Sequence, residues 1–207
     1  MRKSILWTLL LGLSFVFGCK KGEESIQQNN INETLSGKGG GSTPGFQLGQ
    51  IYGGGYIFYI DITGQHGLIS AEKHLGGIAW SPTNPAKATG ALSTSDGSAN
   101  TKRIIQIYGN VANYGSTYAA KACKDYRGGG YTDWYLPSIN ELKSLYDNRS
   151  YSPGFTLTYG YWTSTEESFI TGTPNYSRVH YLDAYYGGGI YVWPSYETCL
   201  VMPIRKF

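Results

Sequence analysis

The chain has 207 residues, of which 41% are hydrophobic and 15% aromatic, and its formal net charge at pH 7 is +3. Arg2 and Lys3 belong to a predicted N-terminal leader, and without them the chain has 15 basic residues (17 − 2) against 14 acidic ones. A net charge of +1 gives no global electrostatic argument for nucleic acid or another polyanion as the partner, and a local basic patch is the alternative that it leaves open.

The first 18 residues are typical of a secretory leader. After the basic start, residues 5–17 form an apolar run of 13, which is shorter than the roughly 20 residues that span a bilayer. The run ends in Gly18-Cys19, which resembles a bacterial lipoprotein lipobox. We predict that residues 1–18 are removed and that Cys19 carries the lipid. The alternative is a buried N-terminal helix with an incidental cysteine.

A flexible tether is predicted over residues 19–45. The segment is polar, has almost no aromatic residues and ends in glycine and serine, so it cannot bury enough apolar surface to offset the entropy lost on ordering. Lys20 is not the aspartate that typically retains lipoproteins at an inner membrane. Glu23-Glu24 resembles the charged export signal of some surface lipoproteins. We therefore expect lipid anchoring in a bacterial outer membrane, with the protein exposed at the cell surface.

The remaining residues, 46–207, are numerous enough for one domain with its own core. They are rich in Gly, Tyr and Trp and poor in Lys and Glu. This composition favours short strands and many turns over a helical bundle.

The predicted elements run from strands through helices to further strands. Two strands, over 56–62 and from Leu68, are joined by a turn at Thr63-Gly64, and a short strand around Trp80 leads into a long polar loop. Helices are predicted over 101–108, over 117–126 and from Ser138. The last strands are predicted over 161–165, 177–183, 189–193 and 199–205. With two main helices between the strands, this order predicts an α+β fold and not a doubly wound sheet.

The stretch 131–147, YTDWYLPSINELKSLYD, is rich in aromatic residues and contains a helix start. Ser138 and Glu141 have the spacing of a capping box, which satisfies two backbone N–H groups at a helix N-terminus. The residues before Pro137 are expected to be extended. We interpret the stretch as structural scaffold, with no catalytic role.

Several segments together resemble the Lcl C-terminal domain family. GGGYIFYID, GQHGLISA, TDWYLPSINELKSLY, YWTSTE and PIRKF occur in the family's order, and the resemblance covers nearly all of residues 50–207. It implies a C-type-lectin-like fold, in which the terminal strands pair and a loop-rich half displays a variable surface. The family's namesake is a bacterial adhesin that binds sulfated glycosaminoglycans. Two features depart from the family: Met202 stands where an arginine is more common, and a Gly-rich tether replaces the namesake's collagen-like stalk.

Cys123 and Cys199 are left after the lipidated cysteine. In an exported protein, two such residues favour a disulfide. The C-type-lectin-like resemblance also implies this pairing, since that fold commonly ties a helix to the final strand. Two separately packed thiols are the alternative.

No catalytic, metal or cofactor site is predicted. His66, His74 and His180 lack the spacing of metal ligands, and no run of carboxylates and amides suits calcium. Residues 70–73 fit the S-x-x-K pattern without its partner motifs. Formylglycine-generating enzymes have a related fold, but they need a reactive cysteine pair.

Aromatic residues are concentrated in residues 151–196, which hold nine of the 19 Tyr and two Trp. Strand alternation places Tyr191 and Trp193 on one face, and Arg178 and His180 share a face of the preceding strand. Such rings suit both sugar faces and protein surfaces, or they pack the sheet. The predicted ligand-binding residues are Tyr176, Arg178, His180, Tyr185, Tyr186, Tyr191, Trp193 and Tyr196.

These observations predict a lipid-anchored cell-surface recognition or adhesion domain. We expect it to bind a glycan, sulfated glycosaminoglycans included, or a surface protein through about residues 159–198. The alternative is a structural envelope lipoprotein that forms part of a surface assembly.

Overall fold

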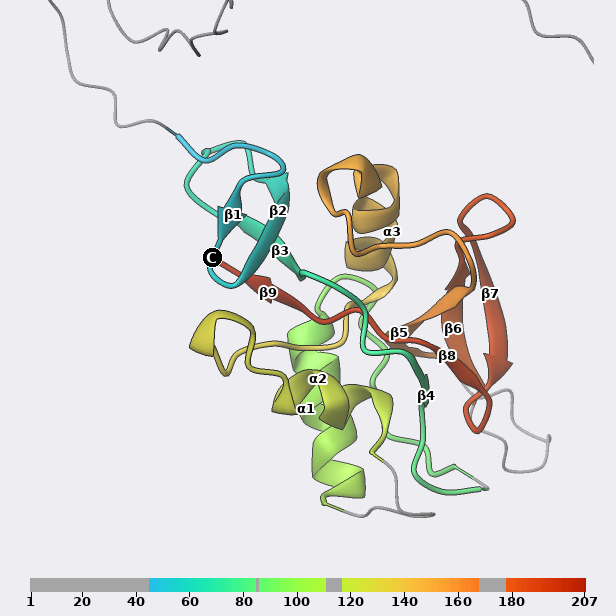
Figure 1. Ribbon diagram of the computed structural model, residues 1–207. Coiled ribbons are helices and arrows are strands. Elements are labelled where there is room, and N and C mark those ends of the chain that lie inside the picture. The colour runs from blue at the N-terminus through green and yellow to red at the C-terminus, as the bar shows by residue number, and fades with distance from the viewer. Residues whose placement is uncertain (1–44, 85, 111–116, 168–177) are drawn as a thin grey trace, which may run out of the picture. The chain divides into compact units, whose positions relative to one another are not determined.

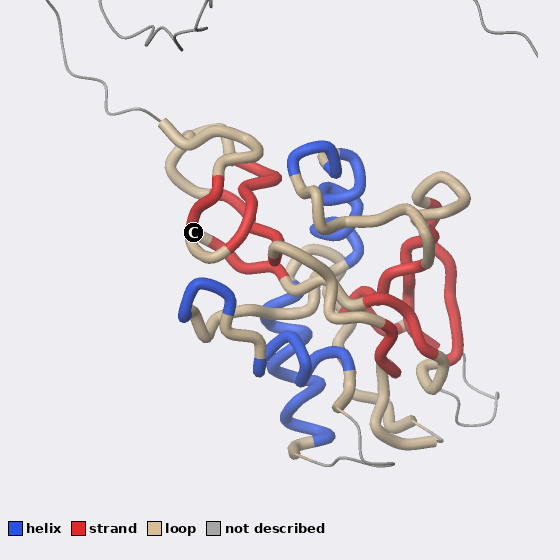
Figure 2. The backbone as a smooth tube through the Cα atoms, viewed as in Figure 1, coloured by secondary structure: helices blue, strands red, loops and turns tan. Residues whose placement is uncertain are grey.

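The computed structural model describes residues 45–84, 86–110, 117–167 and 178–207. The predicted leader, the predicted lipidation site Cys19 and nearly all of the predicted tether lie outside the described residues. Within the described part, the strands gather in two sheets (Figure 2), and helices pack around them (Figure 1). No helix of this part is long and apolar enough to cross a membrane.

The first sheet is antiparallel throughout and has the order β1-β2-β3-β9. Its strands are β1 (Ile51–Tyr52), β2 (Gly55–Ile60), β3 (Gly67–Ala71) and β9 (Ile204–Lys206). The turn between β1 and β2 needs glycine, because Gly54 has φ +87° and a Cβ there would meet the Gly128 carbonyl. The sheet thus joins the beginning of the domain to the end of the chain.

The second sheet is mixed and has the order β4-β8-β5-β6-β7. Its strands are β4 (Gly77–Ala79), β5 (Gly160–Glu166), β6 (Arg178–Asp183), β7 (Gly189–Pro194) and β8 (Thr198–Leu200). Its pairs are antiparallel except that β5 and β8 are parallel. Helices and short strands together confirm the predicted α+β class.

The prediction of one final strand over 199–205 is wrong. The chain leaves the second sheet after β8 and enters the first sheet as β9, with the buried residues 201–203 between them. Pro203 has no N–H and cannot continue a ladder. Its carbonyl accepts a hydrogen bond from Ala71 N at 2.9 Å, so this short connector ties the two sheets together.

Three α-helices lie in the described residues, one near each of the three predicted ranges. They are α1 (Gly97–Tyr108), α2 (Ala119–Asp125) and α3 (Ile139–Asp147), and 3-10 turns cover Gly128–Gly130 and Arg149–Tyr151. The longest is α1, which begins four residues before the predicted start at Thr101. Asp96 explains the difference, because its side chain accepts a hydrogen bond from Ala99 N at 3.1 Å and caps the helix.

The core consists of two clusters. In the view of Figure 1, α3 lies above β9, and α1 and α2 lie below it. One cluster joins the first sheet to α3 through residues such as Phe58, Trp134 and Leu142. The other packs α1 and α2 against the second sheet, with Trp80 and Trp162 fully buried. Burial of these large rings is the main stabilising contribution.

The long loop between β4 and α1 is held by a buried carboxylate. Glu166, at the end of β5, accepts hydrogen bonds from the backbone N–H groups of Thr89, Gly90 and Ala91. The shortest of these bonds is 2.7 Å, to Gly90. Three amides on one carboxylate fix this polar loop against the end of β5.

Candidate ligand-binding site

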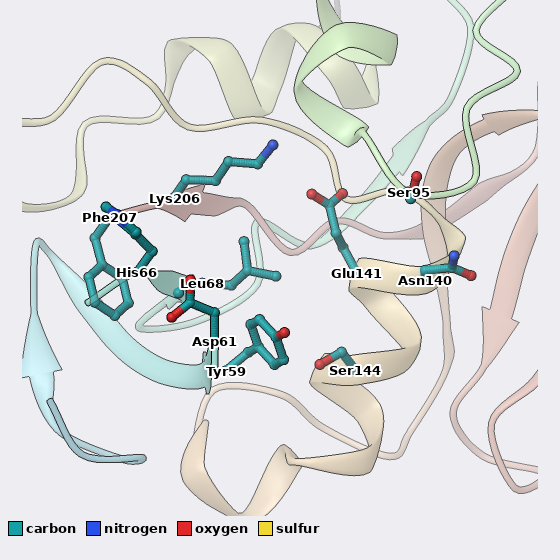
Figure 3. Close-up of a pocket in the computed structure, with 11 residues that line it drawn as sticks. Tyr59, Asp61, His66, Leu68, Ser95, Asn140, Glu141, Ser144, Lys206 and Phe207 are labelled. Atoms are coloured by element: carbon teal, nitrogen blue, oxygen red, sulfur yellow. The ribbon is translucent and has the colours of Figure 1, made fainter. Parts of the chain in front are cut away.

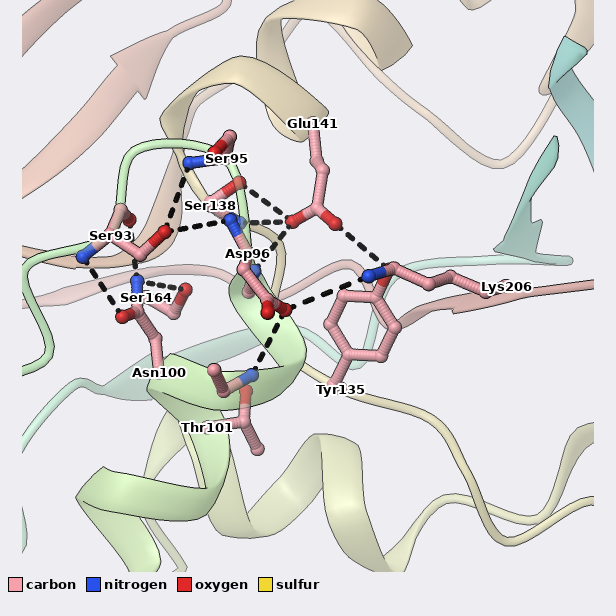
Figure 4. A network of polar contacts seen from close by, with 12 residues as sticks. Ser93, Ser95, Asp96, Asn100, Thr101, Tyr135, Ser138, Glu141, Ser164 and Lys206 are labelled. Atoms are coloured by element: carbon pink, nitrogen blue, oxygen red, sulfur yellow. Dashed lines mark hydrogen bonds and ion pairs between the residues drawn. The ribbon is translucent and has the colours of Figure 1, made fainter. Parts of the chain in front are cut away.

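The stretch 131–147 connects two helix starts, and its centre is Glu141 (Figure 4). Oε2 of this buried carboxylate accepts Ser138 N at 2.8 Å, Ser138 Oγ at 2.7 Å and Gly97 N at 2.9 Å, while Oε1 accepts the Tyr135 hydroxyl at 2.9 Å. The predicted capping box is present, and the same side chain also satisfies the first residue of α1. All four contacts are internal, so Glu141 fastens the fold.

The tyrosine next to Glu141 is held in its neutral form. Burial, and then the neighbouring Glu141 carboxylate, raise the pKa of Tyr135 well above its usual range, so this phenol stays a neutral donor. Lys206 Nζ lies 3.6 Å from Asp96 Oδ1 at the surface of the same network (Figure 4).

The predicted aromatic strand has the expected alternation. Tyr191 and Trp193 of β7 are 51% and 45% exposed, whereas Ile190 and Val192 are half-buried. Tyr185 lies in the turn after β6 and is highly exposed.

Some of these rings surround a depression of about 290 Å³, which we call the aromatic hollow. It is lined by Thr158, Tyr159, Gly160, Tyr181, Asp183, Tyr185, Tyr186, Trp193, Thr198 and Cys199. Tyr181 is its central ring, with the ring centres of Trp193 and Tyr191 at 5.9 and 6.0 Å. The lining comes from β5, β6, β7, β8 and their connections.

A glycine sets the position of the central ring. A Cβ on Gly160 would lie 2.6 Å from Cδ2 of Tyr181, so the ring lies across the bare backbone of β5. Asp183 is held on the same side of β6, and its Oδ1 accepts a hydrogen bond from Tyr186 N at 3.0 Å.

Two predicted residues lie on the other face of β6. Arg178 and His180 pair with Pro194 and Val192, whereas Tyr181 pairs with Tyr191, and directly paired residues share a face. His180 instead places Nε2 2.9 Å from the Glu167 carboxylate and Nδ1 3.2 Å from the Thr165 carbonyl.

The other predicted residues divide as follows. Tyr185, Tyr186 and Trp193 line the hollow, Tyr191 lies beside it, and Tyr196 is exposed in the turn between β7 and β8 without lining it. Tyr176 lies outside the described residues. Sequence reasoning missed Tyr181 and Asp183, although alternation along β6 places them together, opposite to His180.

The electrostatics of the hollow are negative. Asp183 is the one carboxylate in its described lining, which includes no Lys, Arg or His. Burial, then Glu197 and Asp183, raise the pKa of Cys199 to about 12. Burial and then Asp183 also raise the pKa of Tyr181.

The structure does not show the predicted disulfide, because Cys123 and Cys199 are both free thiols. Cys123 is fully buried and Cys199 is half-buried against the same core cluster. Burial raises the pKa of Cys123 well above its ordinary value. Neither thiol is therefore in a setting that activates a nucleophile.

A second, larger cavity of about 550 Å³ lies between the first sheet and α3 (Figure 3). Its lining is Tyr59, Asp61, His66, Gly67, Leu68, Ser95, Asn140, Glu141, Ser144, Lys206 and Phe207. Its two carboxylates have internal partners: Glu141 holds the helix starts, and Thr63 donates to Asp61 at 2.6 Å, which lowers the pKa of Asp61. The sequence did not predict this cavity, since its residues come from four distant segments.

In the part of the chain that the structure describes, no three His, Cys, Asp or Glu side chains gather as metal ligands. Compared with known families, residues 73–205 match the Lcl C-terminal domain. The matched region begins after β3 and includes the second sheet and the three α-helices of the described residues. A comparison with curated proteins finds none that matches the chain.

Proposed function

The chain belongs to the Lcl C-terminal domain family, and from this premise we propose that it is a recognition or adhesion domain of a bacterial cell surface. It binds a glycan or a surface protein through the aromatic hollow and the exposed rings beside it, without catalysis. Cys19 carries the lipid that anchors it in the outer membrane, and the tether over 19–45 holds the domain away from the lipid.

One observation carries the proposal: large rings remain exposed around a single depression. Tyr159, Tyr185, Tyr186 and Trp193 line the hollow with 68%, 64%, 76% and 45% of their surface exposed. Exposed aromatic groups gathered in one place mark interaction sites. Tyr and Trp also lose little conformational entropy on binding, since each has only two side-chain torsions.

We propose a C-type-lectin-like arrangement for the domain. The pairing of β9 with β3 in one sheet supports it, because this brings the end of the chain to the first strands of the domain. The hollow belongs to the second sheet and to the segments that connect its strands, whereas the end of the chain lies in the first sheet.

Binding by the mature protein is tested on a glycan array, followed by titration of the glycans that bind. We expect Trp193→Ala to reduce affinity by about fivefold or more, because each stacked ring contributes on the order of 1 kcal/mol or more. Tyr151→Ala is the matched control, since Tyr151 is also exposed (40%) but lies outside the hollow. Equal binding by both variants and the parent would show that the hollow is not the site.

Surface exposure is tested separately by protease treatment of intact cells. We expect the domain to be digested in intact cells that carry Cys19. Protection from the protease until the cells are broken would contradict a cell-surface role.

A second candidate is an assembly part of the envelope. It is favoured by another set of exposed apolar side chains, on and next to β1 and β2. These are Leu48, Ile51, Tyr52, Tyr59 and Ile62. A partner that co-purifies with the parent, and is lost on Ile51→Ser but not on Trp193→Ala, would support this function over the first.

A further inference from the structure

We infer that the aromatic hollow selects an uncharged sugar, and that Asp183 accepts hydrogen bonds from the sugar's hydroxyl groups. This inference rests on the proposed function and names the class of ligand. It departs from the sulfated ligands that the family resemblance implies.

The charge of the lining argues first against an anionic ligand. Proteins bind sulfate, phosphate and carboxylate groups with Arg or Lys side chains. The described lining of the hollow holds neither, and its single charged group is the carboxylate of Asp183. A sulfated sugar seated here would face a like charge without a counter-ion.

The surroundings strengthen the negative potential. Glu197 lies just before β8, so a second carboxylate lies close in sequence to the lining residues Thr198 and Cys199. Burial and then Glu197 and Asp183 raise the pKa of Cys199.

Arg178, a positively charged residue among the predicted ligand-binding residues, does not offset the negative charge of the hollow. Arg178 is on β6, but the strand register places its side chain on the face opposite to Tyr181 and Asp183. An arginine on the far side of a sheet cannot form the short, bidentate contacts by which guanidinium groups bind sulfate.

The hydrogen-bonding groups match a ring that carries several hydroxyls. Oδ1 of Asp183 is used by Tyr186 N, and among the described residues nothing donates to Oδ2. The hydroxyls of Thr158 and Thr198 also line the hollow. A carboxylate oxygen to which no described residue donates can accept from a sugar hydroxyl, and the two threonine hydroxyls can donate to or accept from the sugar's edge.

The rings supply the complementary apolar contact. Tyr181 and Trp193 lie with their ring centres 5.9 Å apart and an angle of 66° between their planes. A pyranose has a flat C–H face for such a ring and polar groups around its edge. A quaternary ammonium group would use the rings and the carboxylate but leave both threonine hydroxyls without a function. The observations therefore favour the sugar over the organic cation.

The test is calorimetric titration of the mature protein with three kinds of probe: neutral glucose-, mannose- and galactose-based oligosaccharides, a heparin oligosaccharide, and choline. We expect a neutral oligosaccharide to bind, with an affinity that changes less than twofold between 50 and 300 mM salt. Asp183→Asn should weaken that binding about tenfold or more, since hydrogen bonds to a charged group are stronger than neutral ones.

Two further variants keep the result interpretable. Thr198→Val removes a hydroxyl without changing charge and should weaken the neutral sugar severalfold. Asp147→Asn is the control, because Asp147 is an exposed carboxylate on α3 paired with Lys143, and it should leave the affinity unchanged. Thermal melting of each variant checks that the domain remains folded.

Other outcomes overturn the inference. Heparin binding that weakens with salt and is lost in Trp193→Ala would leave the proposed function standing and refute the uncharged ligand. Choline binding lost in Asp183→Asn, or no binding by any neutral probe, would also refute it. If Trp193→Ala and Asp183→Asn both leave sugar binding unchanged, the proposed function fails as well.

Discussion

Two carboxylates beside tyrosine rings have opposite roles in this domain. Glu141 is 6% exposed and its carboxylate accepts four hydrogen bonds from the protein. Asp183 is half-buried, and among the described residues its carboxylate accepts one hydrogen bond, from Tyr186 N. A carboxylate whose oxygens are used by backbone donors stabilises the fold, and one with a spare oxygen at a depression is available for a ligand. The number of internal partners, more than the residue type, distinguishes the scaffold carboxylate from the one in the proposed binding site.

The largest expected effect is that of Glu141→Ala. It leaves Gly97 N, Ser138 N and the Tyr135 hydroxyl without their acceptor, and each buried unpaired group costs roughly 1–3 kcal/mol. We expect the free energy of unfolding to fall by about 5 kcal/mol in a denaturant titration. Asp183→Ala should lower it by less than ~1 kcal/mol. Equal losses of unfolding free energy in Glu141→Ala and Asp183→Ala would contradict the different roles assigned to the two carboxylates.

The predicted disulfide would attach the hollow to the helices. Cys199 lines the hollow and Cys123 lies in α2. A bond between them closes a loop of 76 residues (199 − 123), which the chain-entropy model values at about 4 kcal/mol. If the bond forms in the exported protein, thiol labelling under denaturing conditions should require reduction first, and reduction should lower the melting temperature. Labelling of both thiols without reduction would exclude the bond.

Arg205 is a second scaffold charge, and its loss should have a smaller effect. It donates to both oxygens of Asp133 at 2.8 Å and its guanidinium lies 3.8 Å from the centre of the Tyr131 ring. Arg205→Lys keeps the charge but loses the bidentate pair and the flat contact. We expect a loss of about 2 kcal/mol in unfolding free energy.

The Asp133–Arg205 pair also predicts a pH dependence. Hydrogen bonding to Arg205 holds the pKa of Asp133 below its usual value. A carboxyl group with a lowered pKa in the folded state contributes stability above its unfolded pKa of about 4, and this contribution is lost as pH falls through the folded pKa. Asp133→Asn should therefore be less stable than the parent near pH 6, with a smaller further loss below pH 4. A parallel pair of pH–stability curves would contradict this.

Gly160→Ala should have only a small effect on stability, and it tests the description of the hollow. The new methyl group would displace the Tyr181 ring, at a cost of about 1 kcal/mol. Tyr181 is the central ring of the hollow. The loss in the free energy of ligand binding should therefore exceed the loss in the free energy of unfolding. Gly45→Ala is the control, because a methyl group there has open space around it. Gly187→Ala is unsuitable, because Gly187 has φ +94° and alanine would strain the backbone. Unchanged affinity in Gly160→Ala would show that the position of the Tyr181 ring does not matter.

Local pattern accounts for much of the fold. The capping box at Ser138, the alternation of β7 and the strand over 56–62 were predicted because each depends on residues that are neighbours in the chain. The missed start of α1 was also local, since Asp96 is an ordinary cap that lies inside a polar loop.

The sequence by itself determined which side chains share a face within each strand and where most helices begin. It also determined that aromatic rings are concentrated in residues 151–196. Only the tertiary structure decided that Arg178 and His180 face away from Tyr191, that the final strand is divided between two sheets, and that Asp183 joins Tyr159 and Thr198 at one hollow. The physical reason is that strand register is a property of pairs of strands. A strand's own alternation fixes two faces, but only its neighbours decide which of them meets the solvent.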